Sequence, residues 1–140
     1  MNKKGFTLVE LLAVIVILGI ILIIAVPASI NISKKVKAKM YSNKIANITK
    51  SAVLWGQDNL ECLQKNTGTS DSACANVTCT QEGNIKSCKL TVGDLAAAGY
   101  VDYDNATTVT NPQTGDSMNA ETIEIKYNKA NNSISIGEYK

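Results

Sequence analysis

Glu10 is one acidic residue inside a long apolar stretch of the sequence. From Phe6 to Val26 the other residues are apolar, apart from Thr7 and Gly19. A carboxylate in a membrane segment costs about 2.5–3.5 kcal/mol at the bilayer centre, so such groups usually have a partner or a function. One interpretation places Glu10 near the end of the segment, where its carboxylate reaches the lipid headgroups. The other gives Glu10 a functional role.

The second set of reactive side chains is four cysteines that follow the apolar stretch: Cys62, Cys74, Cys79 and Cys88. An even number of cysteines, clustered in an exported region, indicates two disulfide bonds. A zinc site is the alternative, but the spacings lack the paired C-x2-C of structural zinc sites. If residues 83–84 form a two-residue hairpin turn, Cys79 lies opposite Cys88. Cys62 is then left to pair with Cys74, and a bond from Cys62 to Cys88 is the other pairing to consider.

The sequence carries no recognisable catalytic motif. It has no histidine, the commonest general base, and no G-x-S-x-G, P-loop or H-E-x-x-H pattern. Asp102 and Asp104 form a D-x-D, as at the start of a calcium loop, but the glycine and later acid of an EF-hand are missing. We therefore expect no enzyme activity, no metal and no cofactor.

The apolar stretch has the length of a membrane span. At about 1.5 Å per residue, a helix from Phe6 to Val26 covers the ~30 Å hydrocarbon core, and in lipid the backbone must satisfy its own hydrogen bonds. Pro27 would bend this helix without ending it. A Sec signal peptide cleaved after Ala28 is the alternative, although the stretch is long for one. A mature protein beginning at Phe6 or at Ser29 would distinguish the two.

The residues K-K-G-F-T-L-V-E at positions 3–10 resemble the N-terminal signature of type IV pilins and related pseudopilins. In that family a dedicated peptidase cuts after the glycine and methylates the new terminal residue. The resemblance implies cleavage between Gly5 and Phe6 and N-methylation of Phe6. It also implies that the Glu10 carboxylate pairs with the terminal amine of a neighbouring subunit during assembly.

The same resemblance implies helix flexibility, partners and a location. Gly19 and Pro27 fall where the family loosens its helix within the filament. The expected partners are the prepilin peptidase/methyltransferase, other copies of the chain, other pilins, and an assembly platform protein with its ATPase. Before assembly the chain would lie in the cytoplasmic membrane with its head outside, and after assembly in a pilus on the cell surface.

Beyond Pro27 apolar residues recur every three or four positions, which predicts an amphipathic helix to about Leu63. The apolar stripe contains Ala38, Tyr41, Ile45, Ile48, Ala52 and Trp55. The remaining pattern predicts a loop at 66–80 and strands at 85–90, 122–127 and 134–136. A capping box at Thr91–Asp94 is expected before a short helix at 95–98, followed by an extended Tyr100–Val101. Turns are expected at 111–115 and 131–132.

We therefore predict an α+β pilin fold, in which a long N-terminal helix packs on a small antiparallel sheet. Its divisions would be a leader at residues 1–5, a transmembrane and assembly helix at 6–27, an amphipathic helix at 28–63, and a globular head at 64–140. The string D-L-A-A-A-G-Y-V-D at 94–102 also resembles a segment common in Gram-positive pilin heads.

Charge is unevenly distributed along the chain, whose net charge is +2. Six lysines at positions 34, 35, 37, 39, 44 and 50 have no acid among them, whereas eleven acids face six lysines from Ser51 onward. Membrane-proximal lysines near anionic headgroups are the favoured interpretation. Nucleic-acid binding is the alternative, but lysines without arginine and with few aromatics recognise phosphates and bases poorly. Abundant Lys, Asn and Ile without Arg fit an A/T-rich Gram-positive genome.

The sequence thus predicts a structural subunit of a type IV pilus. A pseudopilin of a type II secretion or competence DNA-uptake system is the first alternative. A membrane-anchored or secreted binding module, whose N-terminus only mimics the signature, is the second.

Overall fold

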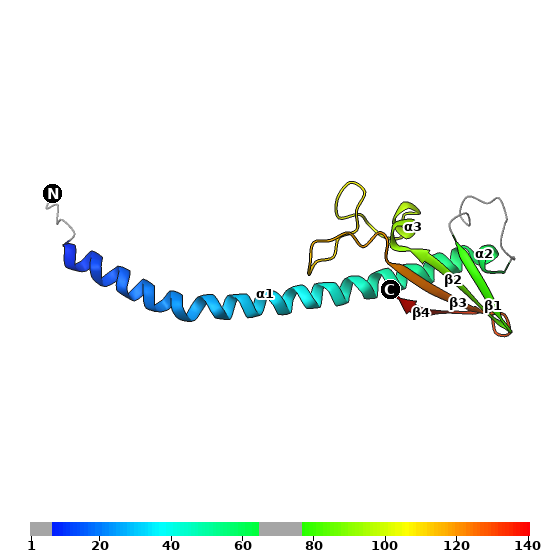
Figure 1. The fold of residues 1–140 in the computed structure, drawn as a ribbon, viewed down its shortest axis with the longest axis horizontal. Helices are drawn as coiled ribbons and strands as arrows, with labels where there is room; N and C mark the ends of the chain where they lie inside the picture. The colour runs from blue at the N-terminus through cyan, green and yellow to red at the C-terminus, as the bar shows by residue number, and fades with distance from the viewer. Residues whose placement is uncertain (1–6, 65–76) are drawn as a thin grey trace. The chain divides into compact units, whose positions relative to one another are not determined.

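The computed structural model describes residues 7–64 and 77–140, and the chain divides into two compact units. The N-terminal unit is Met1–Lys39 and the head is Met40–Lys140. A continuous helix, α1 (Leu8–Asp58), contributes its first part to the N-terminal unit and its last part to the head (Figure 1).

The N-terminal unit consists, in its described residues, of the first part of α1. Many of its residues are β-branched, which lowers intrinsic helix propensity, but a backbone in lipid has no hydrogen-bonding alternative to the helix. The helix continues through Pro27, as predicted, and the Ser29 hydroxyl donates to the Ala25 carbonyl at 3.0 Å just beyond it. In the described part of the chain, α1 is long and apolar enough to cross a membrane.

The last part of α1 presents an apolar stripe to the head. Ile48, Ala52 and Trp55 are buried and Tyr41 is half-buried, whereas Ala38 is exposed. The predicted stripe is therefore wrong at its first member, which lies in the N-terminal unit, and it begins at Tyr41.

The expected helix to Leu63 is divided in two. α1 ends at Asp58, and a short helix, α2 (Leu60–Gln64), follows. The backbone N–H and the side-chain amide of Asn59 both donate to the Trp55 carbonyl, each at 2.9 Å.

The head contains a four-stranded antiparallel sheet with strands in the order β1-β2-β3-β4 (Figure 1). The strands are β1 (Thr78–Glu82), β2 (Ile85–Thr91), β3 (Thr122–Asn128) and β4 (Ser133–Tyr139). The prediction of a loop up to residue 80 is wrong in its last part, because β1 begins at Thr78 and pairs with β2. The two tight turns use left-handed residues, Gly83 at φ 58° and Asn132 at φ 53°.

The core lies between the stripe of α1 and one face of this sheet. Ile123, Ile125 and Tyr127 alternate inward along β3, as predicted. Gly56 lies so close to the sheet that an added Cβ would be 3.4 Å from the side chains of Ile125 and Ile134. The absence of a side chain at Gly56 thus permits close approach of helix and sheet.

A short helix and a long loop connect β2 to β3. The predicted capping box is confirmed: Thr91 Oγ1 accepts from the Asp94 N–H and the Asp94 carboxylate accepts from the Thr91 N–H, at the start of α3 (Val92–Ala97). Gly99 follows at φ 82°, the left-handed conformation expected after a helix. The prediction of an extended segment at residues 100–101 is wrong, because the chain bends there into the loop.

The loop at residues 102–119 is anchored by buried side chains. Val109 and Met118 are buried, and the Val109 N–H donates to the side-chain oxygen of Asn119 at 2.8 Å. The predicted turn at 111–115 is present, with the Gly115 N–H donating to the Asn111 carbonyl at 2.8 Å. A long helix followed by an antiparallel sheet is the predicted α+β, pilin-like architecture.

Candidate assembly site

The Glu10 carboxylate is held by Thr7 at the start of α1. Its Oε2 atom accepts from the Thr7 backbone N–H and from the Thr7 hydroxyl, both at 2.9 Å. In return, Thr7 Oγ1 accepts from the Glu10 N–H at 3.3 Å. These reciprocal bonds form a capping box, in which Thr7 is the N-cap and Glu10 the third helical residue.

The capping box explains how an acid is accommodated at this position. Both bonds from Thr7 go to Oε2, and an ionised carboxylate has about four acceptor sites on its two oxygens. Within the described residues, Oε1 has no recorded hydrogen-bond partner, so the carboxylate retains acceptor capacity for a cation. The sequence analysis missed Thr7 as a member of this site, although the pattern T-L-V-E is the sequence signal of a capping box.

The helix that carries Glu10 exposes its apolar side chains. From Leu8 to Val26 the large apolar side chains are 48–82% exposed in the subunit. A continuous apolar surface of this extent requires lipid or protein to cover it. Because lipid tails are as apolar as leucine, helix association in a membrane depends on packing and on specific polar contacts rather than on hydrophobicity.

The remaining predicted N-terminal positions fall into two groups. Gly5 and Phe6 lie outside the described residues. At Gly19 and Pro27 the helix is continuous in the single subunit, and a Cβ added at Gly19 would have nothing within 4 Å. Loosening of the helix at these two positions concerns the filament and remains a prediction.

The cysteines lie in the head, away from Glu10 in sequence. The β1–β2 hairpin pairs Cys79 with Cys88, with a Cα–Cα distance of 4.0 Å, and a disulfide joins them. This is the pairing that the turn at residues 83–84 predicts. Cys62 is also disulfide-bonded, and its predicted partner, Cys74, lies outside the described residues. The alternative bond from Cys62 to Cys88 is excluded because Cys88 is bonded to Cys79.

Lys86 is buried and lies beside Cys62, and the sequence did not predict this burial. Its side chain is 2% exposed, and Nζ donates to the Cys62 carbonyl at 3.4 Å. Burial, together with the nearby charge of Lys129, lowers the pKa of Lys86. The alternation of β2 places Lys86 on the same inward face as Cys88 and Leu90, but a lysine is rarely buried, so its residue type argues against that position.

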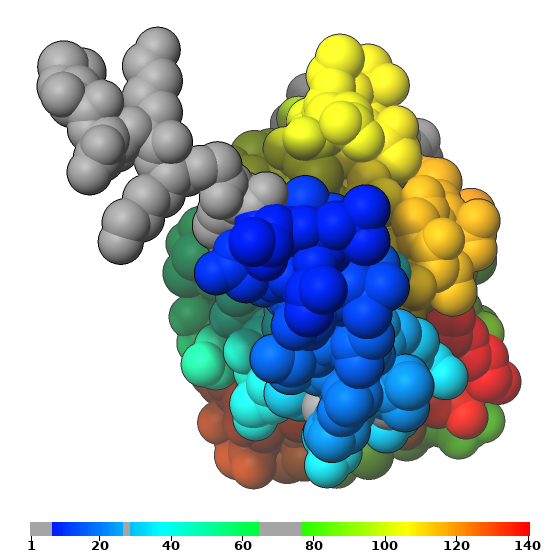
Figure 2. All heavy atoms as spheres, turned by 90° about the vertical axis from the view of Figure 1, so that its left-hand side faces the viewer, coloured from blue at the N-terminus to red at the C-terminus, as the bar shows by residue number. Residues whose placement is uncertain are grey.

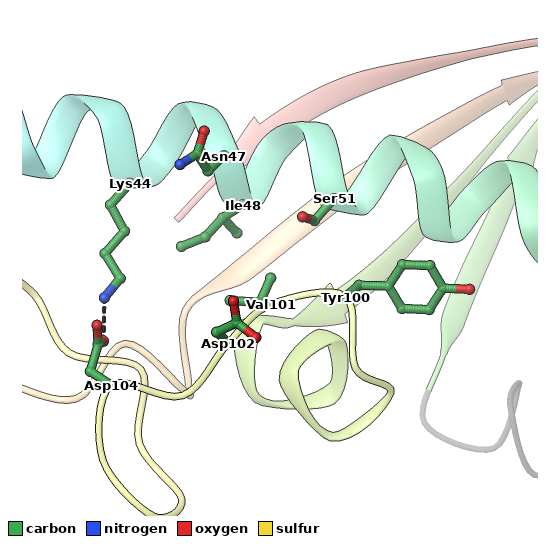
Figure 3. Close-up of a pocket in the computed structure, with 8 residues that line it drawn as sticks. All are labelled: Lys44, Asn47, Ile48, Ser51, Tyr100, Val101, Asp102 and Asp104. Carbon is green, nitrogen blue, oxygen red and sulfur yellow. Dashed lines mark hydrogen bonds and ion pairs between the residues drawn. The ribbon is translucent and has the colours of Figure 1, made fainter.

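A groove lies between α1 and the loop in the head (Figure 3). One part, of about 210 Å³, lies beside Ile48 and Val101, whose side chains point toward each other. A second part, of about 340 Å³, is lined by residues that include Met40 and Pro112. The Lys44–Asp104 ion pair contributes to both parts.

The Lys44–Asp104 ion pair joins α1 to the loop. Asp104 Oδ2 also accepts from the Thr110 N–H at 2.7 Å. The hydrogen bond from Lys44 is the main cause that lowers the pKa of Asp104, and the Thr110 N–H adds to it. Figure 2 shows the loop, coloured yellow to orange, as a raised part of the head's surface. The sequence pattern groups Lys44 with the other lysines of residues 34–50 and gives no reason to pair it with Asp104.

No group of three or more His, Cys, Asp or Glu side chains that could hold a metal ion occurs in residues 7–64 and 77–140. Asp104, the second acid of the D-x-D, is engaged by Lys44.

Comparison with known families identifies the N-terminal segment. Residues 1–26 match the family model described as the prokaryotic N-terminal methylation motif. No curated protein and no solved structure matches the chain. The matched motif is the prepilin signature of the type IV pilin and pseudopilin family, whose members are structural subunits. The motif implies processing by a prepilin peptidase and assembly with other pilins. The motif and the apolar helix together fit a membrane-anchored protein that is type IV pilin-like or a pseudopilin.

Proposed function

We propose that the chain is a structural subunit of a type IV pilus, without enzyme activity of its own. The observation that carries this proposal is the prepilin motif at residues 1–26, which includes the exposed apolar first part of α1. Cleavage after Gly5 would leave Phe6 as an N-methylated amino terminus. The apolar part of α1 would then exchange lipid for the same segment of other subunits as the filament grows.

The Glu10 carboxylate would set the axial register of neighbouring subunits. In a low dielectric an unpaired charge is costly, whereas a paired and hydrogen-bonded charge costs much less. The Phe6 amine of one copy and the Glu10 carboxylate of the next would form such a pair. Thr7 supports this arrangement, because it holds one carboxylate oxygen of Glu10 and leaves the other available.

Two observations on the native cells test the proposal. Mass spectrometry of the subunit should show a chain that begins at N-methylated Phe6, and electron microscopy should show long surface filaments that contain it. Short structures confined below the cell surface would assign the chain to the pseudopilins instead. A mature chain beginning at Ser29 would contradict both assignments.

Substitution of Glu10 tests the assembly contact. The variant Glu10→Ala should be processed and held in the membrane, with at least a tenfold loss of filament. The matched control is Glu82→Ala, which removes an exposed acid from strand β1 of the head and should leave the filament yield unchanged. A bulky residue at Gly5 should instead leave uncleaved precursor in the membrane. A normal filament yield from Glu10→Ala would contradict the pairing.

A further inference from the structure

The basic and acidic residues of this chain occupy separate segments. We call residues 34–39 the lysine segment; it contains Lys34, Lys35, Lys37 and Lys39, and no acid lies between Glu10 and Asp58. We call residues 102–121 the acidic loop; it contains Asp102, Asp104, Asp116 and Glu121, and no lysine lies between Lys89 and Lys126. Segments of opposite charge on two copies of a chain are electrostatically complementary.

One lysine of α1 already binds the acidic loop within the head. Lys44 extends from α1 to the loop and pairs with Asp104 (Figure 3). This pair shows how the acidic loop can bind a lysine: Asp104 Oδ2 accepts from the Lys44 ammonium and from the Thr110 backbone N–H. The lysine segment offers four more side chains of the same chemistry.

The remaining charges of the two segments have unused capacity. Asp102 and Asp116 are exposed, as are the four lysines of the lysine segment. Among the described residues, no ion pair is recorded for Asp102, for Asp116 or for these lysines. Glu121 differs, because its carboxylate accepts from the Tyr139 hydroxyl.

The groove beside the Lys44–Asp104 pair has the size and lining that a lysine side chain needs. Its two parts, of about 210 and 340 Å³, lie near the lower end of the ~300–1,000 Å³ of ordinary small-molecule sites. The half-buried Val101 provides apolar surface for a four-carbon stem, and the exposed Asp102 provides a carboxylate. An apolar stem and an ammonium, the two parts of a lysine side chain, match this lining.

We propose that, in the filament, the lysine segment of one copy docks on the acidic loop and groove of a neighbouring copy's head. This inference rests on the proposed filament function and identifies a second polar contact between its subunits. Before assembly the same lysines would face anionic headgroups, which attract them by about 1 kcal/mol each. Assembly removes the segment from the headgroups, and the acidic loop replaces the lost anionic partner.

Zero-length crosslinking of purified filaments tests the contact directly. Filaments would be grown from a mixture of unlabelled and ¹⁵N-labelled subunits and treated with a carbodiimide, which joins an amine to a touching carboxylate. We expect mixed-isotope links from Lys35 or Lys37 to Asp102 or Asp116, and loss of these links in detergent-dispersed subunits. Filaments without such links, or with links only within one copy, would overturn the proposal.

Charge reversal with rescue provides the second test. Lys35→Glu with Lys37→Glu should reduce filament yield at least fivefold, and Asp102→Lys with Asp116→Lys should do the same. Combining all four reversals in one chain should restore at least half of the yield. Lys129→Glu with Glu82→Lys, two reversals outside both segments, is the matched control and should change the yield less than twofold.

The outcomes separate this inference from the filament proposal. If the native chain forms no filaments, the proposed function fails. If it forms filaments and both sets of reversals leave the yield unchanged, only the lysine contact fails. If the lysine reversals reduce the yield and the acid reversals do not rescue it, the lysines act on lipid and the contact between copies is wrong.

Discussion

The N-terminal unit and the head differ in how far their side chains are buried within the subunit. Every side chain described from Leu8 to Lys39 is exposed, whereas the head buries a continuous apolar core. Among the described residues, no buried side-chain nitrogen or oxygen lacks a hydrogen-bond partner. The head therefore carries its own stabilising contacts, while the apolar helix must obtain its contacts from lipid or from other subunits. One chain thus combines a self-contained fold with a segment whose contacts must come from outside it.

The largest effect should come from separating the two regions. A chain that begins at Met40, exported to an oxidising compartment, should be a soluble monomer that unfolds cooperatively. The full chain should require membrane or detergent because its apolar helix remains attached. Sedimentation velocity and circular dichroism on heating would measure both properties. Aggregation of the shortened chain despite formed disulfides would break the comparison.

A core substitution in the head should have the next largest effect. Trp55 is 2% exposed and packs in the core, so Trp55→Ala should lower the free energy of unfolding by about 3–5 kcal/mol. The neighbouring Leu54 is 51% exposed, and Leu54→Ala should change it by no more than about 0.5 kcal/mol. Urea unfolding of the chain from Met40 would measure both. Equal losses from the two variants would show that the helix packs by another face.

The two capping boxes allow a matched test of the same motif in both regions. Thr91→Ala removes the cap of α3 and should lower the free energy of unfolding of the head by about 1 kcal/mol. Thr7→Ala removes the equivalent bonds at Glu10, outside the head, and should leave the unfolding of the head unchanged while reducing filament yield. Urea unfolding and filament yield would be measured for both variants. A loss of head stability from Thr7→Ala would contradict the independence of the two regions.

The smallest effect should be the pH dependence of the Lys44–Asp104 pair. Because the folded state lowers the pKa of Asp104, this carboxyl contributes stability above its unfolded pKa of about 4, and the contribution is lost as the pH falls through the lower folded pKa. The Asp104 side chain is 45% exposed, so the contribution should be no more than about 1 kcal/mol. Asp104→Asn should therefore flatten the acid side of the stability profile, measured by urea unfolding from pH 6 to pH 2. An unchanged profile would show that the pair adds nothing to stability.

The features predicted correctly from the sequence depend on local patterns. Alternation identified Ile123, Ile125 and Tyr127 as the inward face of β3. The T-x-x-D pattern identified the cap at Thr91, and the two-residue turn at Gly83 placed Cys79 opposite Cys88. Each of these depends on backbone geometry within a few residues, which the residue types themselves determine.

The features missed from the sequence depend on contacts between distant segments. The pairing of Lys44 with Asp104 spans sixty residues, and nothing in either local pattern marks it. Thr7 is different, because the capping-box pattern T-L-V-E is present in the local sequence and could have identified it.

The bonds between Thr7 and Glu10 also bear on how quickly a polymer of such subunits could grow. A freely rotating glutamate samples several rotamers, and immobilising such a side chain costs up to about 2 kcal/mol. Thr7 has already selected one rotamer in the isolated subunit, so an incoming amine meets a carboxylate whose conformational entropy is largely lost beforehand. The Thr7 hydroxyl would in this way reduce the entropic cost of each addition.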